Sequence, residues 1–269
     1  MDSLKTYLRH AASDTVACLR FYSRLPIPPL PIERQPFAML DFDRAIIMLP
    51  LAGGLIGGIG GLALAMANAL HLPPPIAAIL GLAALVLATG AMHEDGLADT
   101  ADGFGGGGTV ARKLDIMRDS RIGSYGGVAL VLSLLLRVAA LGNLAGQGVF
   151  RAALVLVAVA AVSRTLGLLP LVLLPPARTD GAAFAAARPS PQVLACALGL
   201  ACLVGLLPMA AGLALRPLAS GFFCAGLAAW AVTGLAKRQI GGQTGDVAGA
   251  AQQMAEIAFL LAVVAETAV

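Results

Sequence analysis

The chain has 269 residues, of which 58% are hydrophobic and only 12% are charged, with a formal net charge of +3. Its mean hydropathy is +0.85, whereas a soluble domain has about 25% charged residues. These values exclude an ordinary soluble protein and indicate an integral membrane protein. The four cysteines are scattered and lack the paired spacing of a zinc or redox centre, and no feature predicts binding to nucleic acid.

The amino-terminal residues 1–44 carry six basic residues and no uninterrupted apolar run, so they do not resemble a signal peptide. Between Leu4 and Leu25 the apolar residues recur at helical spacing, which predicts an amphipathic helix on the membrane surface. The prolines between Pro26 and Pro31 end this helix. We therefore expect residues 1–44 to be a cytoplasmic, interfacial segment.

Seven apolar runs follow, each close to the ~20 residues that a membrane-spanning helix needs. Period-2 alternation is absent and Ala, Leu and Gly dominate, so the predicted fold class is all-α, a polytopic helical bundle rather than a transmembrane barrel. The bundle is expected over residues 45–269, and residues 1–269 are expected to form one domain. The predicted spans are residues 45–70, 74–92, 124–142, 152–175, 192–210, 217–236 and 248–268.

The distribution of basic residues predicts the orientation of the bundle. With the amino terminus in the cytoplasm, 14 of the 18 Lys and Arg residues lie in cytoplasmic segments, two lie outside and two lie within spans, as the positive-inside rule predicts. The unusual polar motifs then meet at one membrane face. The cytoplasmic segments are residues 1–44, 93–123, 177–191 and 237–247.

The most informative motif is a run of acids directly after the second span. Asp95, Asp99 and Asp102 are spaced i, i+4 and i+7, so in a helix they share one face, where their repulsion costs stability unless a cation lies between them. His93 and Glu94 precede them. Mg²⁺ takes oxygen ligands and usually shares them with substrate phosphates. The alternative is a solvated helix end whose carboxylates merely face water.

A glycine run at residues 103–108 follows the acids. Its amides can approach an anion, and Gly105 and Gly106 are the substrate-binding candidates, but the run lacks the ending of a P-loop, so a plain connector fits equally well. A helix over about 109–121 comes next. Its basic residues are either ordinary positive-inside charge or a phosphate grip beside Asp119, which would help the metal. These basic candidates are Arg112, Lys113, Arg118 and Arg121.

Two arginines fall within predicted spans. Arg164 lies deep in the fourth span, where a charge is costly and is usually functional, so we take it as a substrate-binding candidate. Arg137 lies nearer the outer end of its span, from which a long side chain can reach water, and it is given no role. Glu256, in the last span after Asp246, either supports the metal or neutralises Arg164.

The longer motifs resemble a known family, the adenosylcobinamide-GDP ribazoletransferases, also called cobalamin synthases. The resemblance covers nearly the whole chain. Family members often carry a second acid before the closing Glu, where this chain has Gln252 and Gln253. The motifs are residues 21–28 (FYSRLPIP), 93–103 (HEDGLADTADG), 114–126 (LDIMRDSRIGSYG) and 241–246 (GGQTGD).

The resemblance implies a Mg²⁺-dependent enzyme of the bacterial or archaeal inner membrane, with its active site facing the cytoplasm. Its substrates would be adenosylcobinamide-GDP and α-ribazole or α-ribazole 5′-phosphate, and its products adenosylcobalamin or its 5′-phosphate and GMP. We assign Asp102 as the general base, with His93 as a second catalytic candidate. A homo-oligomer or an association with other cobalamin-pathway enzymes is left open. The metal candidates are Glu94, Asp95, Asp99, Asp119 and Asp246.

Two other functions fit parts of the pattern. A CDP-alcohol phosphotransferase of phospholipid synthesis also uses membrane-embedded aspartates and Mg²⁺, but its motif needs Asp-Gly followed by Ala-Arg, and here Ala98 is followed by Asp99. An ion-coupled transporter carries cations on intramembrane acids. Against a transporter, the acids cluster at one face, and the sequence has no pair of broken helices.

Overall fold

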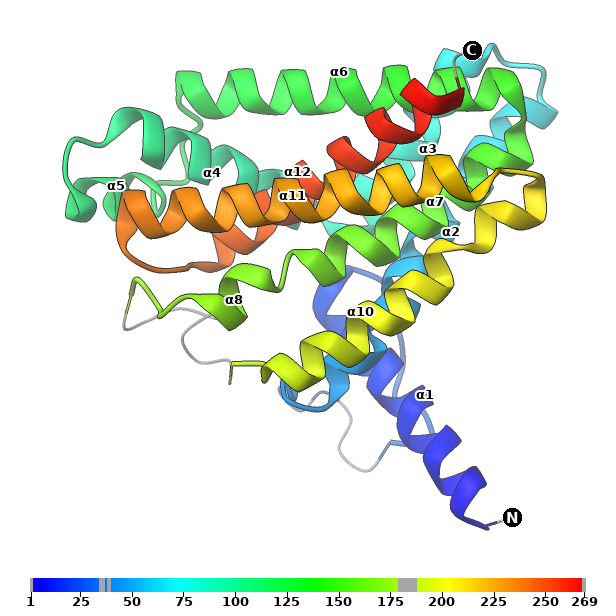
Figure 1. The fold of residues 1–269 in the computed structure, drawn as a ribbon, viewed down its shortest axis with the longest axis horizontal. Helices are drawn as coiled ribbons and strands as arrows, with labels where there is room; N and C mark the ends of the chain where they lie inside the picture. The colour runs from blue at the N-terminus through cyan, green and yellow to red at the C-terminus, as the bar shows by residue number, and fades with distance from the viewer. Residues whose placement is uncertain (1, 34–36, 38–39, 179–187, 268–269) are drawn as a thin grey trace.

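A computed structural model describes residues 2–33, 37, 40–178 and 188–267, and within them the fold is all-α, without a β-strand (Figure 1). The elements are α1 (Asp2–Tyr22), η1 (Ala45–Met48), α2 (Leu49–Ala69), α3 (Pro74–Thr89), α4 (Met92–Gly106), α5 (Val110–Ile116), α6 (Ser124–Gln147), α7 (Val149–Leu166), α8 (Leu169–Leu173), α10 (Pro191–Gly205), η2 (Leu207–Ala211), α11 (Leu215–Ile240) and α12 (Gly245–Thr267).

Six helical segments of the described chain are long and apolar enough to cross a membrane, and they correspond to six of the seven predicted spans. The run predicted at residues 74–92 is a bent pair instead, because α3 and α4 meet at 87°. α3 has no charged residue, whereas α4 carries four acids, so we place the span in α3 and treat α4 as lying beyond it. The predicted helical membrane bundle is confirmed, and so is the amino-terminal helix.

The corner between α3 and α4 is formed by two residues in the left-handed region, Gly90 (φ 64°) and Ala91 (φ 57°). A β-carbon on Gly90 would lie 2.7 Å from the Arg24 side chain, so only glycine fits beside it. The Arg24 amide donates a hydrogen bond to the Ala88 carbonyl at 2.7 Å. The segment that follows α1 therefore covers the corner and fixes the direction in which α4 leaves it.

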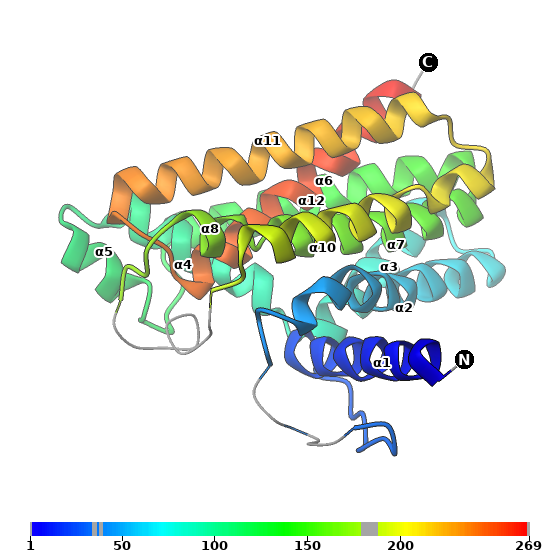
Figure 2. The same cartoon turned by 60° about the horizontal axis from the view of Figure 1, so that its bottom comes forward.

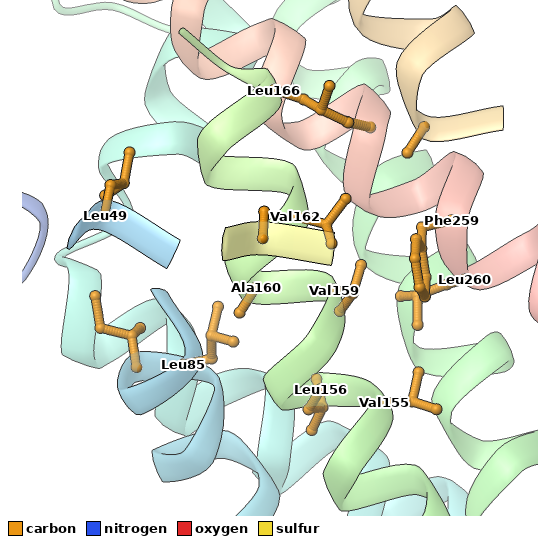
Figure 3. Close-up of a cluster of buried hydrophobic side chains, with 14 of the residues drawn as sticks. Leu49, Leu85, Val155, Leu156, Val159, Ala160, Val162, Leu166, Phe259 and Leu260 are labelled. Atoms are coloured by element: carbon orange, nitrogen blue, oxygen red, sulfur yellow. The ribbon is translucent and has the colours of Figure 1, made fainter. Parts of the chain in front are cut away.

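α7 is the central helix of the bundle, and it packs against α2, α10 and α12. Its middle, residues 152–162, is apolar on all sides, which is typical of a helix buried by its neighbours. Figure 3 shows its side chains meeting residues of α2, α3 and α12. The labelled members of this core are Leu49, Leu85, Val155, Leu156, Val159, Ala160, Val162, Leu166, Phe259 and Leu260.

Three glycines at four-residue spacing let α2 lie directly against α7. A β-carbon on Gly53, Gly57 or Gly61 would come within 3.0 Å of a backbone carbonyl oxygen of α7. Small residues permit such close approach between membrane helices. The predicted close Gly and Ala contacts are therefore confirmed for this helix pair.

The polar segments gather at one end of the bundle. In Figures 1 and 2, α4, α5 and α8 lie at the left, together with the turn between α11 and α12. The turn between α6 and α7 and the turn between η2 and α11 lie at the opposite end. The structure thus confirms that the acid motif, the basic segment after it and residues 241–246 share one end.

The close packing of α2 on α7 yields a prediction about stability. Gly57→Ala places a methyl group 2.4 Å from the Leu156 carbonyl oxygen and should cost roughly 1–3 kcal/mol of stability through overpacking. Gly58→Ala is the matched control, because a β-carbon on Gly58 has no neighbour within 4 Å. Thermal unfolding in detergent micelles measures both. Equal melting temperatures for the two variants would contradict the close helix contact.

Candidate active site

Carboxylates from two helices meet at the polar end of the bundle. Asp95 is exposed and Asp99 partly buried on α4, and Asp246 lies in the first turn of α12. The pKa of the Asp99 carboxyl is raised to about 7, mainly because it is removed from water and also because Asp95, Asp246 and Asp102 repel its charge. The predicted grouping of these acids is therefore present, and its negative charge is poorly compensated.

The approach of α4 to α12 depends on two glycines. A β-carbon on Gly96 would lie 2.8 Å from the Asp246 carbonyl oxygen, and one on Gly249 would lie 3.3 Å from the Gly96 α-carbon. The backbones are therefore in direct contact at this crossing. Any larger side chain at Gly96 would push Asp246 away from the acids of α4.

Asp102 is buried and accepts two backbone hydrogen bonds at the start of α6. One oxygen accepts from the Gly123 amide at 2.7 Å and the other from the Gly126 amide at 2.8 Å. The first amides of a helix lack partners within the helix, and a carboxylate is favourable there. Asp102 thus joins α4 to α6, which is a structural role. Its role as the general base stays a prediction.

A pocket of about 470 Å³ opens beside Asp102, between the end of α4 and the start of α6. Asp119 and Arg121 lie on its rim, and Arg121 donates to Asp119 at 2.6 Å. This hydrogen bond lowers the pKa of the Asp119 carboxyl to about 2. Gly106 also lines the pocket, and Gly105 lies against the Tyr125 ring, which a β-carbon would approach to 2.6 Å. Arg121, one of the predicted phosphate-binding residues, therefore borders a pocket. Its guanidinium is paired with the Asp119 carboxylate.

The helix predicted over residues 109–121 ends earlier, at Ile116. The Asp119 side chain accepts a hydrogen bond from the Arg121 amide at 3.1 Å, and such local side-chain bonds compete with helical backbone bonds. Arg118 consequently lies in an irregular segment rather than on a shared helical face with Arg121. Within α5, Arg112 is exposed and Lys113 donates a hydrogen bond to Gln239 of α11.

One residue near the acids, Arg178, was not predicted from the sequence to belong to the site. The Arg178 guanidinium lies 3.6 Å from the Asp246 carboxylate and donates to the Leu114 carbonyl at 3.1 Å. The Thr244 hydroxyl also donates to Asp246, at 3.1 Å. The sequence marks Arg178 only as a positive-inside charge, because a single arginine shortly after two prolines belongs to no motif. Its positive charge acts on both Asp246 and Asp99, but it balances only part of the negative charge there.

Other candidates lie apart from this cluster. His93 is buried and stacks on the Tyr22 ring, with centroids 6.2 Å apart. The Glu94 carboxylate is directed into the bundle, where Arg137 donates to it at 3.0 Å. Arg164 is buried in α7 and donates to the carbonyl of Ala160. The geometry thus gives no support to His93 as a catalyst, to Glu94 as a metal ligand or to Arg164 as a substrate contact.

The prediction that Arg137 reaches water was wrong. Its side chain is fully buried and forms ion pairs with Glu94 and Glu256, the second at 3.2 Å. Hydropathy gives the depth of a residue in a span, but it does not give the direction that the residue faces, and Arg137 faces the bundle interior. Glu256 consequently pairs with Arg137, a partner that neither sequence alternative included.

The donor chemistry of the acid cluster fits Mg²⁺, which prefers hard oxygen ligands. Asp95 and Asp99 accept no hydrogen bond from any described residue. Within the described ranges, no group of three His, Cys, Asp or Glu side chains is arranged so that it could hold a metal ion by itself. Mg²⁺ usually keeps waters and binds through one or two carboxylates plus substrate phosphates, so a Mg²⁺ ion at these acids would take part of its oxygen ligands from water and substrate.

Comparison with known proteins identifies the family. The sequence model of the cobalamin-5-phosphate synthase family matches residues 14–264. The chain belongs to this family. It is 51% identical over 260 residues to the adenosylcobinamide-GDP ribazoletransferase of Azorhizobium caulinodans, covering 95% of this chain and 97% of the relative. It is 53% identical over 258 residues to the protein of the same name from Xanthobacter autotrophicus, with the same coverage. No solved structure matches the chain.

The contacts of Asp102 predict a loss of stability when its charge is removed. In the native protein, two backbone N–H groups donate to the Asp102 carboxylate. Asp102→Asn places a side-chain NH₂ group against one of them, so one hydrogen bond is lost. The free energy of unfolding should fall by about 0.5–2 kcal/mol, the range for a lost helix cap. Asp95→Asn is the control, because Asp95 is exposed. Thermal unfolding in detergent compares them. A stable Asp102→Asn protein with no turnover would instead favour a purely catalytic role.

Proposed function

We propose that this chain is an adenosylcobinamide-GDP ribazoletransferase that joins adenosylcobinamide-GDP to α-ribazole or its 5′-phosphate and releases GMP. Family membership over nearly the whole chain supports the reaction. The location of the site is inferred from the group of incompletely balanced carboxylates on α4 and α12. The same helix, α4, also supplies Asp102 to the pocket at the polar end of the bundle. Substrates with a pyrophosphate linkage would bring further negative charge to this place.

We assign Mg²⁺ to Asp95, Asp99 and Asp246. When bound, the ion would offset the negative charge of the pyrophosphate and of the departing GMP. The glycine crossing keeps Asp246 close to the α4 acids, and Arg178 supplies a fixed positive charge next to Asp246. A planar guanidinium can also bind two phosphate oxygens at once.

The transfer step needs a base near the pocket. The ribazole hydroxyl oxygen forms a bond to the phosphorus attached to the corrinoid, the bond from that phosphorus to GMP breaks, and the hydroxyl proton must be accepted. We retain Asp102 for this role because it lines the pocket. A carboxylate has about four lone-pair sites, and two of those on Asp102 are used by Gly123 and Gly126, so it can still accept a proton from a bound hydroxyl.

The pocket rim supplies a phosphate-binding arginine. The Arg121 side chain is 87% exposed, and its partner Asp119 is also accessible. Exposed ion pairs are worth little free energy, so a phosphate can compete with Asp119 for the guanidinium. We therefore place a substrate phosphate at Arg121. Asp119 serves as its resting partner rather than as a metal ligand.

We also propose that the site faces the cytoplasm from a bacterial inner membrane. The positive-inside rule supports this orientation, because 14 of the 18 basic residues lie in segments on the proposed cytoplasmic side. A site on this face would meet a cytoplasmic substrate without transport across the membrane.

The metal assignment predicts that Asp95→Asn and Asp99→Asn lose transfer activity while the protein still inserts in the membrane. The amide preserves size but removes the charge that binds Mg²⁺, and a loss of about ten-fold or more is expected. The assay incubates purified protein with adenosylcobinamide-GDP, α-ribazole phosphate and Mg²⁺ and follows GMP by chromatography. Asp115→Asn, an exposed acid on α5, is the matched control. Wild-type turnover in both site variants would reject the assignment.

The orientation predicts which cysteines an impermeant thiol reagent can reach in intact cells. With the native cysteines replaced, Gly245→Cys and Ser120→Cys should be protected, whereas Gln147→Cys at the other end of the bundle should be labelled. All three positions are exposed, so access depends on the side of the membrane. Permeabilised cells provide the control for reactivity. Labelling of residues 120 and 245 in intact cells would reverse the proposed orientation.

A further inference from the structure

A network of charged and polar side chains is buried inside the bundle, directly behind the acid helix. Arg137 of α6 has no exposed surface, and its guanidinium binds Glu94 of α4 at 3.0 Å and Glu256 of α12 at 3.2 Å. One arginine therefore connects three helices. Ionised groups in the interior of a membrane protein are expensive and usually have a function.

Two glutamines extend the network to a fourth helix. Gln253 donates to Glu94 at 3.2 Å and accepts from Ser133 of α6 at 3.1 Å. Gln252 donates to Glu256 at 2.7 Å and to Ser163 of α7 at 2.9 Å. Their long amide side chains thus bridge the carboxylates to both neighbouring helices, at the positions where the sequence departs from the usual family pattern.

The network is balanced in charge. Arg164 of α7 is also buried, and the charges of Glu94 and Glu256 act on it. Two arginines therefore face two glutamates. A buried ion pair seldom adds stability over an apolar replacement, but it can fix how the joined elements are arranged. Specific positioning therefore explains the network better than stability does.

The two glutamates belong to the helices that carry the proposed cation ligands. Glu94 immediately precedes Asp95 on α4, and Glu256 lies on the same helix as Asp246. The Arg137 bridge therefore restrains rotation of α4 on α12, and the glycine crossing sets how closely the two backbones approach. Rotation of α4 would turn Asp95 and Asp99 away from Asp246.

We propose that Arg137 is a positioning residue that holds α4 on α12 through Glu94 and Glu256 and thereby sets the affinity of the acid cluster for a divalent cation. This inference rests on the cation site of the proposed function. Arg137 itself touches neither the cation nor the substrates. Its effect is expected in the geometry of the helix pair and in cation affinity, before any chemistry.

Two variants test the bridge without leaving an unbalanced charge. Arg137→Lys keeps the charge, but the lysine side chain is shorter and does not reach the position of Nη1, the one guanidinium nitrogen that contacts both carboxylates. The double variant Arg137→Met, Glu256→Met removes one charge of each sign. A protein in which apolar side chains replace a buried ion pair is often as stable as the original protein. Thr233→Ala is the matched control, because Thr233 is also buried but donates only within its own helix, to Ala229.

The first measurement is the distance between α4 and α12, which requires no cation. Nitroxides on Gly106→Cys and Gly245→Cys, in a chain without its native cysteines, report this distance by pulsed EPR. Both positions are exposed and have room for a side chain. A single narrow distribution is expected in the parent and in Thr233→Ala, and a broadened or shifted one in both bridge variants. An unchanged distribution in folded bridge variants overturns the positioning role.

The second measurement is Mn²⁺ binding to the substrate-free protein, followed by the EPR signal of free Mn²⁺. The dissociation constant should rise about ten-fold or more in both bridge variants, comparable to the loss of a group that orients a metal ligand, and stay unchanged in Thr233→Ala. If the helix distance changes but Mn²⁺ affinity does not, the link to cation affinity is overturned. Absence of Mn²⁺ binding in the parent protein would instead contradict the cation site of the proposed function, and the distance measurement would still decide the positioning role.

Discussion

The direct backbone contact between Gly96 on α4 and Gly249 on α12 is the interaction on which the rest of the site depends. It brings Asp246 to the acids of α4 although more than 140 residues separate them in the chain. Their mutual repulsion has to be opposed by packing elsewhere, which the α2–α7 core provides, whereas the buried ion pairs fix how α4 lies on α12. A side chain as small as Ala at this crossing would therefore alter the chemistry as well as the fold.

Much of the architecture was predictable because the bilayer imposes one dominant length and one dominant composition on each span. Hydropathy located the seven apolar runs, and the distribution of charge predicted that the polar motifs gather at one end. The corner at Gly90 was not predicted, because an apolar run contains no sign of a helix that stops and turns. Nor was the direction of Arg137, since position along a span does not determine which neighbour a side chain faces.

Within the site, spacing predicted that three acids share one face, and residue type suggested a cation, because both inferences depend only on local geometry. The functions of individual side chains depend on distant partners and were harder to infer. Glu94 and Asp95 are adjacent in sequence, yet one is in a buried ion pair and the other faces water. Asp102 meets the first amides of α6, and Arg178 approaches Asp246 from another segment. Long-range contacts of this kind require the tertiary structure.

The turn between α3 and α4 also determines the dielectric environment of the reaction. With the span placed in α3, the acids of α4 lie beyond the apolar segment, and water at the exposed Asp95 weakens their repulsion. A bulky substrate that covers the pocket would displace this water, and every charge interaction in the site would then become stronger. Binding of the substrate would thus convert a hydrated acidic surface into a site of low dielectric constant.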